Sequence, residues 1–530
     1  MARPSSPAGP ADRRRVAVAA PHHLAVDAAR EVVESGGGAV DAALAAAMAL
    51  TVAYPHQSAL GGDLFAVVRR PDGSTTSIDA SGPYGSGGSP PDGRVPVSGP
   101  LSVTVPGLVS GWEALHGLGG TLPVARLLAP AVRLASDGVE VTARLAAAIA
   151  DVDLGSEDDP GLRALVSGPD GRRLAAGGLL RQERLAESLG RLADDGLRSF
   201  YDGGLGDDVA AALGRLGVPV TRDDLRRHTC TTTPALTVEA AGCRLSTAPP
   251  GSQGYLLLTT MLAGDRLAEV GVEVDHRVLL ELFARTGERR DAELADPAHM
   301  TATGADLLDR RRVEEDVALV LDRLRSSTPG ASPAVRAGGD TVAVTAVGAD
   351  GTAVSLIQSL FHYFGSRLHD AATGITFHNR AAGFSPGVGA PNSLAPGKRP
   401  AHTLMPLVVE HADGWVAAHG AMGGRQQPQI HAQVLRRRLA GADAAESVSA
   451  PRFVVGAVDE AGTYGVLAEP GLGEPTIADL SAGRLPVRRT AHLDEAVGHA
   501  MVCTRHADGT LDAGADPRSD GAAWQGAPGT

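Results

Sequence analysis

Residues 338–366, GGDTVAVTAVGADGTAVSLIQSLFHYFGS, decide the fold that we predict for this chain of 530 residues. Apolar and small residues alternate over residues 341–347, a turn signal follows at Ala349-Asp350-Gly351, and a second run covers residues 352–359. This pattern is typical of a β-hairpin. Thr341 opens the first strand directly after Asp340, and Ser359 lies on the second strand.

Thr341 becomes chemically interesting if the peptide bond before it is cut. Its hydroxyl would then be a nucleophile, and its own free α-amine would be the base that activates it. An α-amine has a pKa of about 7.7 to 8.0, so a useful fraction is unprotonated near neutral pH. The alternative reading is that a β-branched residue simply opens a strand, where such residues are favoured.

Composition describes an acidic globular protein. Hydrophobic residues make up 43% of the chain, and 48 basic against 61 acidic side chains give a net charge of −13. This charge argues against a nucleic-acid or anionic-membrane partner. The three cysteines, Cys230, Cys243 and Cys503, lack the spacing of a zinc site or a disulfide framework, and we expect them to be small buried hydrophobes.

The N-terminus predicts a cytoplasmic protein. Residues 1–15 are rich in Pro, Ser and Ala, as in a disordered leader, and no apolar run typical of a signal peptide or of a membrane span follows. Histidines 56, 362, 402 and 419 occur without an HxxxH or HExxH motif. We therefore expect no metal and no other cofactor.

Several further elements can be placed from turn signals and periodicity. We expect a strand at residues 16–20, two helices within residues 24–53, a hairpin turning at Pro71-Asp72-Gly73, and helices starting near Pro106 and Pro130. Residues 326–339 are rich in Ser, Pro and Gly and predict a flexible, exposed segment. The tail, residues 508–526, reads as polar and turn-rich.

Ten segments spread over nearly the whole chain resemble the γ-glutamyltranspeptidase family of N-terminal-nucleophile hydrolases. They are GGGAVDAALAAAMAL, SALGGDLF, VPGLVSGWEALHGLGG, LLAPAVRLASDGVEV, APPGSQG, GDTVAVTAVGADGTAVSLIQS, FGSRL, GITFHNRAAGFS, APGKRPAHTLMP and GAMGGR. Their order and spacing carry the resemblance, since none of them is decisive alone.

The resemblance implies an α+β fold, a four-layer αββα sandwich whose precursor cuts itself into two subunits that stay together. The cut would fall between Asp340 and Thr341. Residues 16–340 would form the large subunit, and residues 341–530 would form the small subunit with Thr341 at its N-terminus.

The same resemblance assigns roles to residues of the small subunit. Ser359 stands where the family has a Thr that hydrogen-bonds the nucleophile. Gly423 and Gly424 match the paired glycines of the oxyanion hole, and the helix that follows them offers backbone amides to an anion. Thr403 and His402 occupy the family's Ser-Ser site, which holds the substrate α-carboxylate.

Four positions depart from the family pattern. Ser81 stands in place of the arginine that holds the γ-glutamyl α-carboxylate, and Phe361 replaces an asparagine. Arg380 and Gly383 lie where an acidic residue grips the substrate α-amine. These changes predict that ordinary glutathione is not the substrate, whereas the acyl-transfer chemistry is retained.

Arg380 admits two interpretations. It can bind a carboxylate on a different acyl group, as in similar acylases that remove glutaryl-type side chains, or it can pair with an Asp or Glu of the large subunit.

We therefore expect an autoprocessing Thr hydrolase or acyltransferase that acts on a small molecule through an acyl-enzyme. Two enzymatic alternatives are a glutaryl or cephalosporin-type amidase and a homologue from secondary metabolism that hydrolyses a C–C bond in an alkylproline-precursor pathway. The second is suggested by the arginine bias of the chain, in which Lys398 is the only lysine. A third alternative is an inert, unprocessed homologue that acts as a binding protein.

Overall fold

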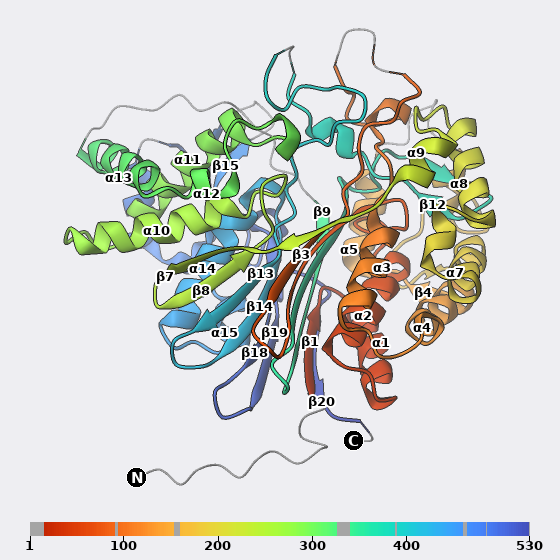
Figure 1. Ribbon diagram of the computed structural model, residues 1–530, viewed down its shortest axis with the longest axis horizontal. Helices are drawn as coiled ribbons and strands as arrows, with labels where there is room; N and C mark the ends of the chain where they lie inside the picture. The colour runs from red at the N-terminus through yellow and green to blue at the C-terminus, as the bar shows by residue number, and fades with distance from the viewer. Residues whose placement is uncertain are drawn as a thin grey trace.

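The computed structural model describes residues 15–88, 90, 94–152, 160–325, 340–386, 389–458, 464–483 and 485–528, and Figure 1 shows their arrangement. Two β-sheets pack face to face, and helices cover the outer face of each (Figure 1). The predicted αββα sandwich is confirmed. The predicted leader, apart from Arg15, and the predicted flexible segment 326–339 lie outside the described residues.

The first sheet contains the hairpin that opened the sequence analysis. Its seven described strands are antiparallel to their neighbours, and β9 and β10 lie near its centre. In spatial order they are β20 (Ala522–Gly526), β1 (Val16–Ala20), β9 (Asp340–Gly348), β10 (Ala353–Phe361), β2 (Asp63–Arg69), β3 (Thr75–Asp79) and β6 (Thr231–Pro234).

The second sheet has six described strands, again all antiparallel. In spatial order they are β19 (Leu511–Ala515), β18 (His499–Arg505), β14 (Val416–Met422), β13 (Leu407–His411), β8 (Cys243–Thr247) and β7 (Leu236–Ala240). Each sheet combines strands from before and after residue 340, so the two halves of the chain share both sheets and their common core.

The core between the sheets is built from small and aliphatic side chains. Ala343 and Ile357 of the first sheet contact a cluster that includes Val408 and Ala418 of the second. The sheets approach closely at Gly420 in β14, where a Cβ atom would lie 2.8 Å from the Cβ atom of Ala343. A larger residue at this position would push the two sheets apart.

Helices of the N-terminal half cover the outer face of the first sheet (Figure 1). They are α1 (His23–Glu34), α2 (Ala39–Ala53), α3 (Leu108–Gly119), α4 (Val124–Asp137), α5 (Ala143–Asp151), α7 (Glu183–Asp195) and α8 (Gly204–Arg215). α2 is buried along its whole length, because its many alanines let neighbouring elements approach from every side. Asp41 caps its first turn by accepting a hydrogen bond from Gly38 N at 2.9 Å.

The outer face of the second sheet is covered by α10 (Tyr255–Glu269), α11 (His276–Glu293), α13 (Arg310–Arg325), α14 (Gln427–Leu439) and α15 (Ala444–Ser449). The shorter elements are α6 (Pro160–Leu165), α9 (Arg222–Arg227), α12 (Gly304–Leu307), α16 (Glu474–Ser481), β4 (Val139–Glu140), β5 (Leu179–Leu180), β11 (His369–Asp370), β12 (Ile375–Thr376), β15 (Phe453–Val458), β16 (Tyr464–Ala468) and β17 (Val487–Arg489).

Most predicted elements are confirmed, including the β9–β10 hairpin, the first strand, α1 with α2, and the β2–β3 hairpin. Two expectations were wrong. Pro130 lies inside α4, not at its start, because the buried face of Leu127, Leu128 and Ala131 continues across it and holds the helix together. The tail is not mainly turns, since β19 and β20 pair with β18 and β1.

None of the helices in the described part of the chain combines the length and the apolar character that a membrane span needs.

Cys230, Cys243 and Cys503 are free thiols. Cys243 and Cys503 are buried, as expected, and Cys230 is partly buried.

Candidate active site

The β9–β10 hairpin brings the two predicted hydroxyls together. Thr341 is fully buried, and its Oγ1 donates a hydrogen bond to Ser359 Oγ at 3.2 Å. Ser359 Oγ in turn donates to the carbonyl oxygen of Asp340 at 2.5 Å. A continuous chain of hydrogen bonds therefore runs from the Thr341 hydroxyl to the carbonyl of the residue before it.

A β-bulge fixes the position of Ser359. The register between β9 and β10 shifts between Gln358 and Phe361, and Phe361 has a φ of +80°, a backbone conformation that non-glycine residues rarely adopt. Phe361 N donates to Ser359 Oγ at 2.7 Å. Ser359 thus accepts two hydrogen bonds, which leaves its own proton directed at Asp340 O.

Asp63, at the start of β2, is the centre of a buried polar cluster beside this hairpin. It pairs with Ser359 in the sheet, and its Oδ2 accepts hydrogen bonds from His378 Nδ1 at 3.0 Å, His402 Nε2 at 3.1 Å and Arg380 Nε at 3.3 Å. Burial favours the neutral acid, but the hydrogen bonds and positive charge around Asp63 prevail and lower its pKa. Asp63 Oδ1 has no partner among the described residues.

Arg380 lies in a 3₁₀ turn, Arg380–Gly383, and is completely buried. Besides its ion pair with Asp63, its Nη1 donates to Thr403 Oγ1 at 3.3 Å, and its guanidinium lies 4.1 Å from the centre of the Phe361 ring. The pairing with an acidic residue of segment 16–340 is thus observed. Within the described chain, however, Nη2 has no acceptor.

His402 contacts Asp63, and Thr403 contacts Arg380. Burial, reinforced by the positive charge of Arg380, lowers the pKa of His402 to about 3, so its imidazole is neutral at neutral pH. Thr403 presents its hydroxyl to Arg380, and its backbone carbonyl accepts a hydrogen bond from Gln253 Nε2 at 2.7 Å.

Gly423 and Gly424 lie between β14 and α14 and both need positive φ angles, +146° and +52°. A Cβ atom on Gly423 would lie 2.5 Å from Ile430 Cδ1, so a larger residue does not fit there. The carbonyl of Gly424 accepts from Gln253 Nε2 at 2.7 Å, and Gln253 Oε1 accepts from Arg290 Nε at 3.0 Å. Gln253 therefore ties Gly424 to Thr403.

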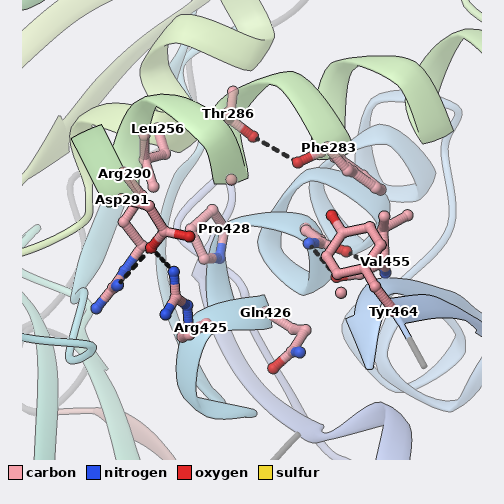
Figure 2. A pocket seen from close by; sticks show the side chains of 13 residues that line it. Leu256, Phe283, Thr286, Arg290, Asp291, Arg425, Gln426, Pro428, Val455 and Tyr464 are labelled. Atoms are coloured by element: carbon pink, nitrogen blue, oxygen red, sulfur yellow. Dashed lines mark hydrogen bonds and ion pairs between the residues drawn. The ribbon is translucent and has the colours of Figure 1, made fainter. Parts of the chain in front are cut away.

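Behind this glycine turn lies a small polar pocket, which Figure 2 shows. Asp291 forms ion pairs with Arg425 on one side and Arg290 on the other (Figure 2). Asp291 therefore links Arg290 to Arg425, the residue that follows Gly424.

Ser81 and Gly383 occupy the edges of the cluster. Ser81 does not bond to Arg380; its Oγ and N donate to Asp79 Oδ1 at 2.6 and 2.9 Å. A Cβ atom on Gly383 would lie 4.0 Å from Phe361 Cε1, so a side chain at this position would contact that ring. The structure thus brings Gly383 next to Phe361 and places Ser81 in a neighbouring hydrogen-bond group.

The side chain of Asp340 is largely buried near Glu495. Burial, reinforced by the negative charge of Glu495, raises the pKa of its side chain well above the ordinary value. Glu495 is bonded to Gln57 Nε2 at 3.2 Å and to Arg144 Nη1 at 3.1 Å.

The residues that the sequence analysis missed are Asp63, His378, Gln253 and Arg290. A signal existed for two of them, because Asp63 opens the apolar run of β2 and His378 closely follows β12, so both are polar residues at the ends of largely buried strands. In the described chain, no group of three or more His, Cys, Asp or Glu side chains is arranged to hold a metal ion.

The chain is similar to known proteins over nearly its whole length. The family model described as gamma-glutamyltranspeptidase matches residues 25–526. An oxamate amidohydrolase proenzyme of Klebsiella pneumoniae is 38% identical, covering 95% of this chain and 97% of that protein. A glutathione hydrolase-like proenzyme of Bacillus subtilis is 31% identical over 96% of this chain and 97% of its own length.

Among solved structures, a cephalosporin acylase from Bacillus halodurans has a TM-score of 0.84 and 27% identity, covering 99% of this chain and all of that one. Together with the four-layer sandwich, these matches identify the fold as that of the N-terminal-nucleophile hydrolases. The chain belongs to the gamma-glutamyltranspeptidase family of hydrolases and transferases.

Proposed function

We propose that this chain is an autoprocessing amidohydrolase in which Thr341 attacks the amide of a small, carboxylate-bearing molecule of the oxamate type. The observation that carries the proposal is the hydrogen-bond chain from Thr341 Oγ1 through Ser359 Oγ to Asp340 O. It joins the nucleophile to the carbonyl that must be attacked for the chain to activate itself.

In the first reaction, Thr341 Oγ attacks the carbonyl carbon of Asp340. The Thr341 hydroxyl passes its proton to Ser359, which gives its own proton to the carbonyl oxygen as the C–O bond forms. Collapse of this intermediate re-forms the C=O bond, passes the hydroxyl proton to the Thr341 nitrogen and breaks the C–N bond, which leaves an ester with a free α-amine on Thr341. Water then hydrolyses the ester, which separates residues 1–340 from residues 341–530.

In the second reaction, the same hydroxyl attacks the substrate amide. The α-amine of Thr341 accepts the hydroxyl proton and delivers it to the leaving nitrogen, which departs as ammonia. The amides of the Gly423-Gly424 turn stabilise the oxyanion, a contribution of about 3 to 4 kcal/mol per donor in other enzymes. Water then releases the acid from the acyl-enzyme.

Two unpaired atoms support a small substrate with a carboxylate beside an amide. Among the residues that the structure describes, Arg380 Nη2 lacks an acceptor and Asp63 Oδ1 lacks a donor, although both are buried. A substrate carboxylate on Arg380 and Thr403, with its amide N–H₂ directed at Asp63 Oδ1, would satisfy both atoms. The 38% identical relative is named for oxamate, a molecule that carries these two groups on adjacent carbons.

The proposal is tested first by self-cleavage. Freshly purified protein should yield two polypeptides whose masses place the cut between Asp340 and Thr341, and Thr341→Ala should give a single uncut chain. Persistent full-length wild-type protein would support the inert binding homologue instead. A Thr341→Ala chain that is still cut would show that the nucleophile has been misassigned.

Substrate class is tested on the processed enzyme. We expect ammonia release from oxamate with a kcat/KM at least tenfold above amine release from a γ-glutamyl anilide or a glutaryl anilide. Preference for the glutaryl compound would favour the acylase alternative, which the resemblance to the cephalosporin acylase supports. Preference for the γ-glutamyl compound would refute our interpretation of Ser81 and Gly383. Processed enzyme without any amidase activity would favour the C–C hydrolase.

A further inference from the structure

A second pocket, of about 530 Å³, lies beside β3 and outside the catalytic cluster. Its apolar wall includes Phe65, Pro250 and Met300, and its polar groups include Asp79 and Arg399. This volume is in the range of small-molecule sites, which combine apolar walls with a few directed polar groups. Arg399 follows the proposed cut and the other four residues precede it, so the pocket is shared by the two proposed subunits.

Asp79 has one carboxylate oxygen free. Its Oδ1 accepts two hydrogen bonds from Ser81, whereas its Oδ2 has no donor within the described part of the chain. Burial raises the pKa of Asp79, and the positive charge of Arg399 acts against this effect. The carboxylate thus lies in a site where a further positive charge would stabilise it.

Arg399 likewise uses only some of its hydrogen-bond donors within the described residues. Its Nε donates to the carbonyl oxygen of Ser81 at 2.9 Å, and its backbone N donates to Asp296 Oδ2 at 2.8 Å. Its two terminal nitrogens, Nη1 and Nη2, have no acceptor among the residues that the structure describes, and they form no ion pair with Asp79 within 4.0 Å. The guanidinium fork is therefore available for a carboxylate.

Ser81 sets the spacing of these two charges. Its N and Oγ hold Asp79, and its carbonyl oxygen holds Arg399. An acidic and a basic group thus line one pocket without closing onto each other. A ligand that carries both an ammonium and a carboxylate group would pair with both.

We propose that this pocket binds a free α-amino acid with an apolar side chain. The ammonium group pairs with Asp79 Oδ2, the carboxylate pairs with the Arg399 fork, and the side chain packs against Phe65, Pro250 and Met300. The pocket adjoins the catalytic cluster, because the Phe65 ring lies 4.6 Å from the ring of His402. Binding does not depend on the chemistry proposed for Thr341.

The test is isothermal titration calorimetry of the wild-type protein with L-leucine, 4-methylpentanoate and 3-methylbutylamine. The latter two lack the ammonium and the carboxylate group, respectively. We expect leucine to bind at least tenfold more tightly than either analogue and to bind equally well in the presence of oxamate. Undetectable leucine binding at millimolar concentration, or equal affinity for all three compounds, would overturn the proposal.

Three variants localise the binding. Asp79→Asn should weaken the binding of leucine at least tenfold and that of 4-methylpentanoate, which has no ammonium group, much less. Arg399→Gln should weaken the binding of leucine but change that of 3-methylbutylamine, which has no carboxylate, much less. Ala302→Trp, at a half-buried position that lines the pocket, should block leucine while leaving both charges intact. Leucine affinity that is unchanged in all three would place the ligand elsewhere.

Matched controls are Asp72→Asn and Arg244→Gln, which make the same changes on exposed side chains away from the pocket, and both should bind leucine normally. Thermal unfolding checks that each variant is folded. If Asp79→Asn does not fold, Ala302→Trp and the analogue series still decide the outcome.

Discussion

Ser359 donates a hydrogen bond of 2.5 Å to the carbonyl oxygen of Asp340. Thr341 must attack the carbon of this carbonyl group if the chain cuts itself. The same hydroxyl accepts from Thr341 Oγ1 and from Phe361 N. Ser359 is thus placed both to take the nucleophile's proton and to stabilise the charge that develops on the carbonyl oxygen.

Removal of this hydroxyl should slow processing. We expect Ser359→Ala to reduce the rate of self-cleavage about 100-fold, the usual effect of losing one oxyanion donor, and Ser359→Thr to restore most of it. The rate is followed by denaturing electrophoresis after synthesis of the chain. Ser355→Ala is the matched control, since Ser355 lies on the same strand but donates to His419 O. Equal cleavage rates for the two alanine variants would contradict the assignment.

Arg380 should distinguish substrates by charge. Lysine keeps the positive charge but loses the planar fork, so we expect Arg380→Lys to lower kcat/KM for oxamate about 10- to 100-fold, consistent with a loss of about 1.5 to 3 kcal/mol from a charged hydrogen bond. Hydrolysis of acetamide, which has no carboxylate, should change less than threefold.

The control for this variant is Arg69→Lys, which alters another largely buried arginine, paired with Glu410 at 2.6 Å. It should leave both substrates unaffected. A parallel loss of oxamate and acetamide turnover in Arg380→Lys would show that Arg380 only supports the structure of the cluster through Asp63.

The hairpin could be predicted because it depends on local patterns, namely alternation in β9 and β10 and the turn residues Asp350-Gly351. The sandwich was predicted because ten segments, in their order along the chain, resemble the γ-glutamyltranspeptidase family. It could not predict the Asp63 cluster. Asp63 and His402 are more than 300 residues apart in the sequence. Which charges meet when a strand, a 3₁₀ turn and a loop pack together depends on the fold rather than on local sequence.

Arg380 illustrates the limit most clearly. Its two interpretations, a carboxylate ligand or an ion pair, could not be separated without knowing that Asp63 Oδ2 lies 3.3 Å from its Nε. Ser81 is the opposite case. Its difference from the family pattern was visible in the sequence, but its contacts with Asp79 and Arg399 required the fold.

Gln253 should act on catalysis without touching substrate. Its side chain holds the carbonyls of Thr403 and Gly424 at 2.7 Å each, so Gln253→Ala should let the glycine turn move and leave both carbonyls unpaired. We expect kcat for oxamate to fall about tenfold, an effect of about 1.4 kcal/mol, with KM changed less than threefold.

Gln429→Ala is the matched control, because Gln429 is also buried and bridges backbone groups, namely N and O of Val455. Steady-state kinetics and thermal unfolding of both variants separate a catalytic from a structural effect. A similar loss of stability in both, with kcat lowered only in Gln253→Ala, would confirm the positioning role. Lower kcat in both would assign the effect to general loosening of the fold.

Buried histidines should make the protein sensitive to acid. Burial lowers the pKa of His431 from 6.5 to about 3. Between these values the unfolded chain binds a proton that the folded chain does not, so the free energy of unfolding falls as the pH drops below about 6.5, by up to about 1.4 kcal/mol per pH unit for this group.

His431→Leu removes the group, and its thermal midpoint should therefore approach or exceed that of the wild type as the pH is lowered from 7.5 to 5. His23→Leu makes the same change on an exposed side chain and is the matched control for the loss of a histidine. A constant difference between His431→Leu and the wild type at every pH would mean that His431 binds protons equally in the folded and unfolded chains, which would contradict a pKa lowered by burial.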